Sequence, residues 1–297
     1  MTRTREYKRD FAALATALTS VSVSGPFTVG FSGPVLAIAM WRNLLGALAT
    51  MPFAWRQRHA LRTLSRRQLG LMTLSGVLLA AHFATWMGSL RFTSIAASTA
   101  LVATQVVWAA LLAFRDGHRA PRMEWIGIGI ALFGVLVLTG IDFGLDAHAI
   151  IGDGLAVLGA MTAAAYVNVG QKLRSEVPLN IYTSIVYSVS ALTLFGMVLI
   201  GGLQWHGFGM QDWLLIIGVT LFAQIGGHSL MNQALRSFSA TTVSLGLLLE
   251  VPGSTLVGWI WPGQTPPWQL LPALALVLAG LVIVLRSTRE PIVAEPN

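Results

Sequence analysis

The chain has 297 residues, of which 55% are hydrophobic and only 10% are charged, and its mean hydropathy is +0.69. A soluble domain of this length cannot bury so much apolar surface, so the composition excludes an ordinary water-soluble protein and indicates that lipid surrounds most of the chain. The absence of cysteine excludes disulfides, thiolate nucleophiles and cysteine-ligated metals. The net charge of +7 does not indicate nucleic-acid binding, because the basic residues lie in short links rather than on one continuous face.

Ten apolar runs of about 20 residues, the length that a helix needs to cross a bilayer, follow a short basic tail at residues 1–10. We interpret the first run as a retained span rather than a signal peptide, because the chain continues far beyond it. The runs are at residues 11–31, 33–55, 68–90, 95–114, 123–141, 150–172, 180–202, 212–234, 239–261 and 267–286. We therefore predict an all-α integral membrane protein with ten transmembrane helices, five in residues 11–143 and five in residues 148–286, followed by a second tail at residues 287–297.

The distribution of positive charge predicts the orientation, because cytoplasmic links carry an excess of Lys and Arg. With the N-terminus inside, every Lys and Arg except Arg42 and Arg91 falls in a cytoplasmic tail or link. The outer links at residues 141–153 and 201–212 contain carboxylates and no Lys or Arg. We therefore predict a multi-pass protein of the plasma membrane, the bacterial inner membrane, with both termini in the cytoplasm.

Two pairs of stretches indicate that one unit is used twice. LRFTSIAASTALVATQVV (90–107) recurs in degenerate form as LRSFSATTVSLGLLLEVP (235–252), and IALFGVLVL (130–138) matches LVLAGLVIV (276–284). Because five spans is an odd number, the second unit must enter the membrane from the opposite side, which gives inverted repeats. Inverted repeats are typical of alternating-access transporters, whose substrate site lies near the midplane between the two copies.

These features resemble the EamA family of the drug/metabolite transporter superfamily. The resemblance rests on the ten spans, the two Leu-Arg segments, the Glu250 and Pro252 pair and the ending LALVLAGLVIVL, and it covers nearly the whole chain. It implies a transporter, since members of the family mostly export amino acids, other small metabolites or drugs. Many relatives have Pro directly after the Glu, whereas Val251 intervenes here, and no Pro lies near Gln105. We therefore expect a helix break in the second copy only.

Glu250 is the one carboxylate deep inside an apolar run, and Gln105 is its counterpart in the first copy. Glu250 lies about 11 residues into its span, or ~17 Å at ~1.5 Å per residue, close to the midplane. A carboxylate there can carry a proton or pair with a substrate ammonium, and such residues mark transport pathways more often than packing. The alternative is a structural hydrogen bond to Ser, Thr or backbone groups freed by Pro252.

Arg42 is a second charge inside a span, because too few residues separate it from Arg56 for the span to begin after it. Its guanidinium needs a carboxylate, a helix C-terminus or an anionic substrate as a partner. Snorkelling to the outer surface and a bond to backbone carbonyls are the alternatives. His82 and His228 fall at nearly equivalent places in the two copies, where they either relay protons or make helix-to-helix hydrogen bonds.

Several polar and aromatic side chains are further candidates to line a cavity. The first span carries hydroxyls at an i, i+4 spacing beside a possible break at Gly25 and Pro26, and this stripe either lines a polar cavity or packs helices closely. Its members are Thr16, Ser20, Ser24 and Thr28. The other candidates are Trp86, Trp108, Tyr166, Asn168, Tyr187 and Gln224. Gly127 and Ala131 form a small-xxx-small pair that favours helix packing, within the chain or in a dimer.

No enzyme motif is present, and neither G-x-S-x-G, H-E-x-x-H nor a Walker A sequence occurs. The sequence therefore predicts a secondary transporter without metal or cofactor, driven by a gradient, that is proton-coupled or facilitative and is a monomer or a weak homodimer. Its expected substrates are amino acids or similar zwitterions, since Glu250 can meet an ammonium and Arg42 a carboxylate. Export of cationic or aromatic drugs is the alternative within this class, and a membrane scaffold or an intramembrane enzyme is the alternative of another class.

Overall fold

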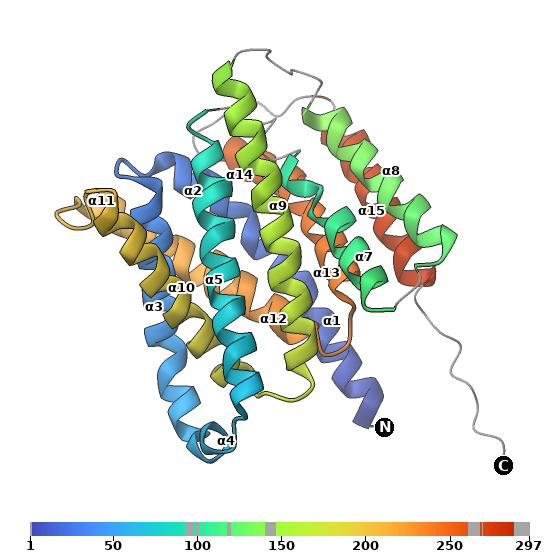
Figure 1. Ribbon diagram of the computed structural model, residues 1–297. Coiled ribbons are helices and arrows are strands. Elements are labelled where there is room, and N and C mark those ends of the chain that lie inside the picture. The colour runs from blue at the N-terminus through green and yellow to red at the C-terminus, as the bar shows by residue number, and fades with distance from the viewer. Residues whose placement is uncertain are drawn as a thin grey trace.

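The computed structural model describes residues 2–92, 98, 101–117, 120–139, 147–260, 268 and 270–287, and the described residues form helices and turns with no strand (Figure 1). The first half contains α1 (Thr2–Ser20), η1 (Val21–Val23), α2 (Ser24–Gly30), α3 (Val35–Arg56), α4 (Arg58–Arg62), α5 (Arg66–Ser89), α7 (Gln105–Arg115) and α8 (Arg122–Thr139). The second half contains α9 (Ala147–Arg174), α10 (Leu179–Ile200), α11 (Met210–Val219), η2 (Thr220–Ser229), α12 (Leu230–Ala234), α13 (Ala240–Gly246), η3 (Leu247–Leu249), α14 (Glu250–Ile260) and α15 (Leu270–Ser287).

Six helical segments are long and apolar enough to cross a membrane, which agrees with a multi-pass membrane protein. They are Glu6–Gly30, Val35–Arg56, Arg66–Ser89, Ile150–Arg174, Leu179–Ile200 and Met210–Ala234. Shorter or interrupted helices lie in the other four predicted ranges. The total of ten spans and their inverted arrangement therefore stay predictions. Parts of the repeated stretch at 90–107 and of the 141–153 link, and the C-terminal tail from residue 288, lie outside the described residues.

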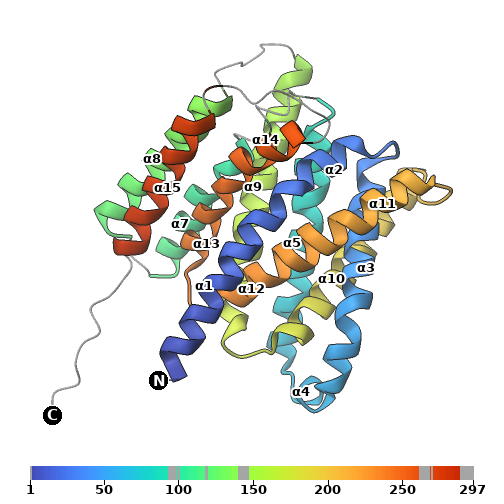
Figure 2. The ribbon, with the colours of Figure 1, turned by 180° about the vertical axis from the view of Figure 1, so that it is seen from behind.

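The helices pack side by side in one bundle (Figures 1 and 2). Helix α5 lies along α9 and α10, α10 also lies along α3, and α7 packs on α9 and α13. Helices α8 and α15 lie along each other at one side of the bundle. Their close approach depends on glycine: a Cβ added at Gly127 would lie 2.8 Å from the carbonyl oxygen of Gly280, and one at Gly134 would lie 2.9 Å from that of Ala273. Gly127 therefore packs helices within this chain.

The two ends of the bundle carry different links. The N-terminus, α4, the turn between α9 and α10 and the turn between α12 and α13 lie at one end, which we call the N-terminal end (Figure 1). Residues 2–10 of the predicted tail are helical and form the start of α1. The buried carboxylate of Asp10 accepts hydrogen bonds from Gln233 Nε2 at 3.2 Å and Ser237 Oγ at 2.6 Å and so fixes α1 to the second half.

Contacts between the halves also join the opposite end. Ser32 donates its backbone N–H and its hydroxyl to the two carboxylate oxygens of Asp212, at 3.0 and 2.7 Å. Trp41 Nε1 donates to the carbonyl oxygen of Trp205 at 2.7 Å, and the rings of Phe31 and Phe208 pack edge to face with centroids 5.0 Å apart. Both ends of the bundle are therefore tied across the two halves.

Candidate functional site

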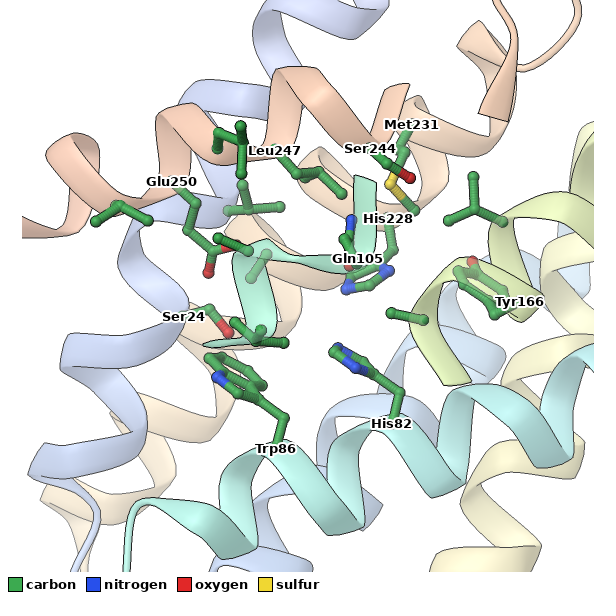
Figure 3. Close-up of a pocket in the computed structure, with 18 residues that line it drawn as sticks. Ser24, His82, Trp86, Gln105, Tyr166, His228, Met231, Ser244, Leu247 and Glu250 are labelled. Atoms are coloured by element: carbon green, nitrogen blue, oxygen red, sulfur yellow. The ribbon is translucent and has the colours of Figure 1, made fainter. Parts of the chain in front are cut away.

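A cavity in the middle of the bundle is lined by both halves of the chain (Figure 3). It holds about 60 Å³, room for a few water molecules. Seven of the residues predicted from the sequence line it, and they are Ser24, His82, Trp86, Gln105, Tyr166, His228 and Glu250. We call this space the central cavity. It gathers side chains that are far apart in the sequence.

Interrupted helices surround the central cavity. A 3₁₀ turn, η1, precedes Ser24, and another, η3, precedes Glu250. Each break lies within a few residues of a proline, which lacks the N–H that would bond the carbonyl four residues earlier. Pro26 frees the carbonyl of Ser22 in this way, and Ser254 Oγ of α14 donates to that oxygen at 2.9 Å. The break in the first helix is thus stabilised by the helix that carries Glu250.

The π-helical segment η2 is a third irregular element, and it supplies two predicted site residues, Gln224 and His228. Wide π turns are rare and occur frequently at functional sites. A Cβ at Gly226 would lie 3.0 Å from Ser20 Oγ, so glycine allows η2 to pass close to the first helix. The sequence analysis did not predict this segment, because apolar residues and glycines alone do not distinguish a π turn from an α turn.

The first copy also has a break, contrary to the prediction from Pro252. Residues 101–103 are helical, Thr104 is a turn and α7 begins at Gln105. Thr104 Oγ1 donates to the carbonyl oxygen of Leu101 at 2.6 Å. A local hydrogen bond of this kind, from a threonine side chain to the backbone, competes with the regular helical hydrogen bonds. Gln105 and Glu250 are therefore the first residues of α7 and α14, in equivalent positions.

Arg42 lies fully buried beside the central cavity. Its Nε donates to Gln224 Oε1 at 2.8 Å and its Nη1 donates to Ser24 Oγ at 3.1 Å, while the guanidinium carbon lies 4.4 Å from the ring centroid of Phe83. Burial excludes the snorkelling interpretation, since the side chain does not reach the surface. Glu250 attracts Arg42 electrostatically, but no carboxylate oxygen lies within 4.0 Å of its guanidinium among the described residues. Ser24, bonded to Arg42, lies between the arginine and the cavity.

A polar layer behind the central cavity holds Arg42 in place. Gln224 Nε2 donates to Asn43 Oδ1 at 3.1 Å, so the amide that accepts from Arg42 is itself oriented. Tyr187 hydrogen-bonds Ser229 Oγ at 2.9 Å and donates to the carbonyl oxygen of Gln224 at 3.3 Å. Tyr187 and Gln224 are thus buried supports rather than lining residues. Asn43 was missed by the sequence analysis, although its position next to an intramembrane arginine was a usable signal.

The two histidines both line the central cavity. His82 Nδ1 hydrogen-bonds the carbonyl oxygen of Gly159 at 3.0 Å, and its ring stacks on Trp86 with centroids 5.7 Å apart. The ring of Phe83 lies edge to face with His228 at 5.4 Å. His82 is thus fixed by a helix-to-helix bond, one of the two predicted roles, while Nδ1 of His228 has no hydrogen-bond partner.

The hydroxyl stripe of the first span does not line the cavity as a whole. Thr16 is exposed, Ser20 is half-buried against η2, Ser24 lines the cavity, and Thr28 bonds its own helix at the carbonyl of Ser24. At 3.6 residues per turn, an i, i+4 step advances by about 40°, so three steps turn Thr16 about 120° away from Thr28. Two other candidates also lie outside the lining: Trp108 is half-buried, and Asn168 is buried on α9.

Among the described residues, four buried polar atoms without a hydrogen-bond partner belong to residues lining the central cavity. They are Trp86 Nε1, Gln105 Nε2, His228 Nδ1 and Ser244 Oγ. Arg42 Nη2, next to the cavity, also lacks a partner in the described part of the chain. Buried polar groups are normally paired with protein or water, so these groups are free to bond polar ligand atoms. Figure 3 shows Glu250 and Ser24 on one side, Tyr166 on the other, and Gln105 and His228 between them.

The EamA-like transporter family model matches residues 10–140 and, a second time, residues 150–286. The chain belongs to the EamA-like transporter family. An uncharacterized transporter of Archaeoglobus fulgidus is 22% identical to this EamA-like chain over 281 residues, which are 93% of this chain and 96% of the relative. A solved crystal structure superposes with a TM-score of 0.75 at 17% identity, covering 96% of this chain and 98% of the other. The last likeness concerns the fold alone, whereas the family assigns the chain to membrane transporters.

Proposed function

We propose that the protein is a secondary transporter that exports amino acids or similar small zwitterions through the central cavity. It works by alternating access between two inverted five-helix halves, with both termini in the cytoplasm and the protein in the plasma membrane. The double match of the family model supports the two halves, and the charge distribution supports the orientation. The direction of transport follows from the resemblance to exporters of this family.

The proposed substrate class rests on the hydrogen-bond donors and acceptors that line the central cavity. Glu250 is the one carboxylate among its lining residues and offers acceptors to an ammonium group. Trp86 Nε1 and Gln105 Nε2 are unpaired donors that suit a carboxylate, and Arg42 adds positive charge behind Ser24. A zwitterion satisfies both sets, since its ammonium and carboxylate groups carry opposite charges on the same α-carbon.

The ties at both ends of the bundle support alternating access. The central cavity, of about 60 Å³, lies between them, so the halves must separate for substrate to reach it. The Ser32 and Asp212 contact closes the halves at one end and the Asp10 and Ser237 contact closes them at the other. Both contacts are hydrogen bonds to carboxylates at bundle ends, where water competes for them once they open.

A matched set of substrates tests the proposal in proteoliposomes. Counterflow of a labelled amino acid is measured in the presence of three competitors in excess. They are the unlabelled amino acid, its N-acetyl derivative, which lacks the ammonium group, and its decarboxylated amine, which lacks the carboxylate. We expect competition by the amino acid and weak competition by both derivatives. Equal competition by the amine would favour the cationic-drug exporter, and absence of any amino acid counterflow would contradict the proposal. Accumulation driven by an imposed pH gradient separates proton coupling from facilitated diffusion.

Thiol labelling tests whether the cavity opens to water, which a membrane scaffold does not require. Ser24→Cys places a thiol in the lining of the central cavity of this cysteine-free chain, and Thr16→Cys places one at an exposed position of the same segment, Glu6–Gly30. We expect a membrane-impermeant thiol reagent to label Ser24→Cys, with substrate slowing the reaction, and to leave the lipid-facing Thr16→Cys unlabelled. Complete protection of Ser24→Cys from both sides of the membrane would support a scaffold instead.

A further inference from the structure

A second cavity, of about 570 Å³, lies at the N-terminal end of the bundle and is lined by three arginines from separate elements. Arg9 comes from α1, Arg174 from the last turn of α9, and Arg236 from the turn after α12. The other polar side chains of the lining are Gln57, Ser175, Glu176, Asn180 and Gln233. We call this space the basic cavity. Neither the family nor the central cavity accounts for it.

The positive charge of the basic cavity is not neutralised by the described residues. Arg9 is paired with Asp10 at 3.4 Å, and Glu176, the one carboxylate residue that lines the cavity, is within 3.8 Å of Arg67 outside it. Arg174 and Arg236 have no carboxylate oxygen within 4.0 Å in the described parts of the chain. Arg174 is only 4% exposed. Asp10 attracts Arg174 electrostatically but makes no ion pair with it, and a buried guanidinium outside an ion pair is costly, so the cavity favours a bound anion.

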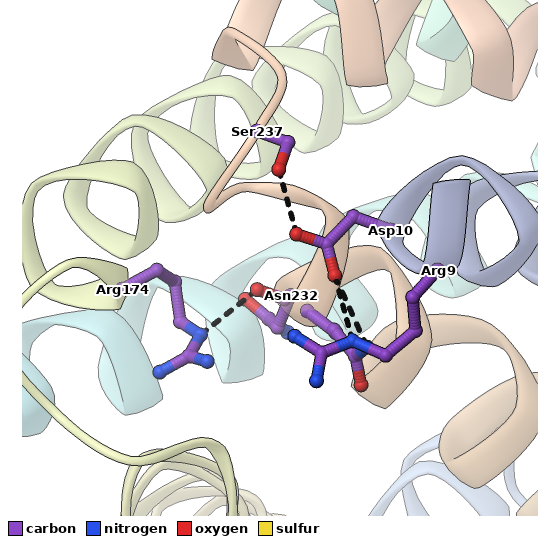
Figure 4. Close-up of polar contacts among 6 residues, drawn as sticks. Arg9, Asp10, Arg174, Asn232 and Ser237 are labelled. Atoms are coloured by element: carbon purple, nitrogen blue, oxygen red, sulfur yellow. Dashed lines mark hydrogen bonds and ion pairs between the residues drawn. The ribbon is translucent and has the colours of Figure 1, made fainter. Parts of the chain in front are cut away.

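The guanidinium of Arg174 is held in a fixed orientation. Its Nε donates to the carbonyl oxygen of Asn232 at 2.9 Å (Figure 4). Its Nη1 donates to the carbonyl oxygen of Val177, so both bonds are to backbone. A planar guanidinium fixed in this way suits the geometry of a phosphate group. Nearby, Asp10 bridges Arg9 and Ser237, which brings α1 to the same place (Figure 4).

The N-terminus of α10 opens onto the same cavity. Pro178 occupies the N-cap without a side-chain hydrogen bond, and no acidic residue lies in the first turn. Leu179 and Asn180, whose backbone N–H groups belong to the first turn, line the cavity. The first N–H groups of a helix have no partner within it and attract anions, phosphate in particular. The helix end and the buried Arg174 thus point independently to the same class of ligand.

We propose that the basic cavity is a binding site for a phosphate-bearing anion, whose phosphate contacts Arg174, Arg236 and the N-terminus of α10. The phosphate belongs either to the headgroup of an anionic phospholipid or to a free phosphate compound. Basic pockets between helices at the membrane surface are suited to anionic headgroups. Because α1, α9 and the turn after α12 meet there, a bound phosphate holds the two halves together at this end.

Thermal unfolding of the full-length protein in detergent tests the proposal, with tryptophan fluorescence as the readout. Phosphatidylglycerol, the neutral phosphatidylcholine and inorganic phosphate are each titrated into wild-type protein. The test variant is Arg9→Gln with Arg236→Gln, which removes two charges from the cavity rim without removing the backbone bonds of Arg174. Its matched control is Arg58→Gln with Arg62→Gln, which removes two exposed arginines of α4 at the same end of the bundle.

We expect phosphatidylglycerol or phosphate to raise the Tm and phosphatidylcholine to leave it unchanged. The apparent affinity falls about thirtyfold in the test variant and stays within about twofold in the control, since each of the two arginines removed contributes about 1 kcal/mol at an anionic surface. Stabilisation by phosphatidylglycerol alone identifies a lipid headgroup, and stabilisation by phosphate as well identifies a free phosphate compound. Equal losses in both variants, or equal stabilisation by phosphatidylcholine, would overturn the proposal.

Discussion

The segments that begin at Gln105 and at Glu250 occupy equivalent positions in the two halves, and they differ in charge and in the cause of the helix break. The first break depends on the hydroxyl of Thr104, which bonds Leu101. The second lies beside Pro252, and its helix also donates Ser254 Oγ to the first helix at Ser22. The two copies thus share a backbone arrangement while only one of them carries a carboxylate.

This difference teaches that the backbone symmetry and the chemical asymmetry have separate causes. Two chemically different side chains produce an interruption at the same place, so the interruption itself is what the fold requires there. The carboxylate of Glu250 lies on the same side of the central cavity as Ser24 (Figure 3). Ser24 in turn accepts a hydrogen bond from Arg42, so a positive charge lies near Glu250.

Glu250→Gln gives both copies the same side chain and is expected to have the largest effect. Transport of the zwitterion should fall by about tenfold or more, because a hydrogen bond to a charged group contributes about 1.5–3 kcal/mol. Counterflow in proteoliposomes measures the loss. Glu124→Gln is the matched control, since Glu124 is also buried but does not line the central cavity.

Exchanging the two side chains sharpens the same prediction. Gln105→Glu in the Glu250→Gln protein restores a carboxylate at the equivalent helix start, but away from Ser24 and Arg42. We therefore expect it to leave counterflow low. Full recovery would show that the two positions are interchangeable and that Arg42 has no part in the asymmetry.

Pro252→Ala changes the cause of the second break without changing the charge. Alanine supplies the N–H that proline lacks, so the helix can continue through η3 and turn Glu250 relative to the cavity. We expect transport to fall on the order of threefold, as for other residues at which a helix changes direction, while the Tm stays close to that of wild type. Unchanged transport would mean that the break does not position Glu250.

Thr104→Val is expected to have the smallest effect, because it removes one hydroxyl and preserves the shape of the side chain. Losing the bond to the carbonyl of Leu101 should lower the free energy of unfolding by about 1 kcal/mol. Transport should stay near the wild-type rate, since Gln105 keeps its place. The comparison of its Tm with that of Pro252→Ala shows which of the two breaks the fold depends on more.

The features that could be predicted from the sequence rest on composition and on isolated polar residues. Apolar runs must become helices in lipid, because the backbone has no water to bond, and this indicated the membrane helices. Glu250, Arg42 and the two histidines stood out because such groups are rare in apolar runs. Thr16 and Trp108 were wrong as cavity candidates, since spacing along one helix does not tell which side a neighbouring helix covers.

The sequence by itself determined that this chain is a helical membrane protein with a polar centre, because burial in lipid constrains every long apolar run in the same way. Only the tertiary structure decided which polar side chains meet. Arg42 and Gln224 come from opposite halves of the chain, and so do Gln105 and His228, yet each pair shares one place in the bundle. Arg9, Arg174 and Arg236 likewise come from distant parts of the sequence and meet in the basic cavity. Contacts between residues so far apart in the sequence depend on helix packing rather than on local periodicity.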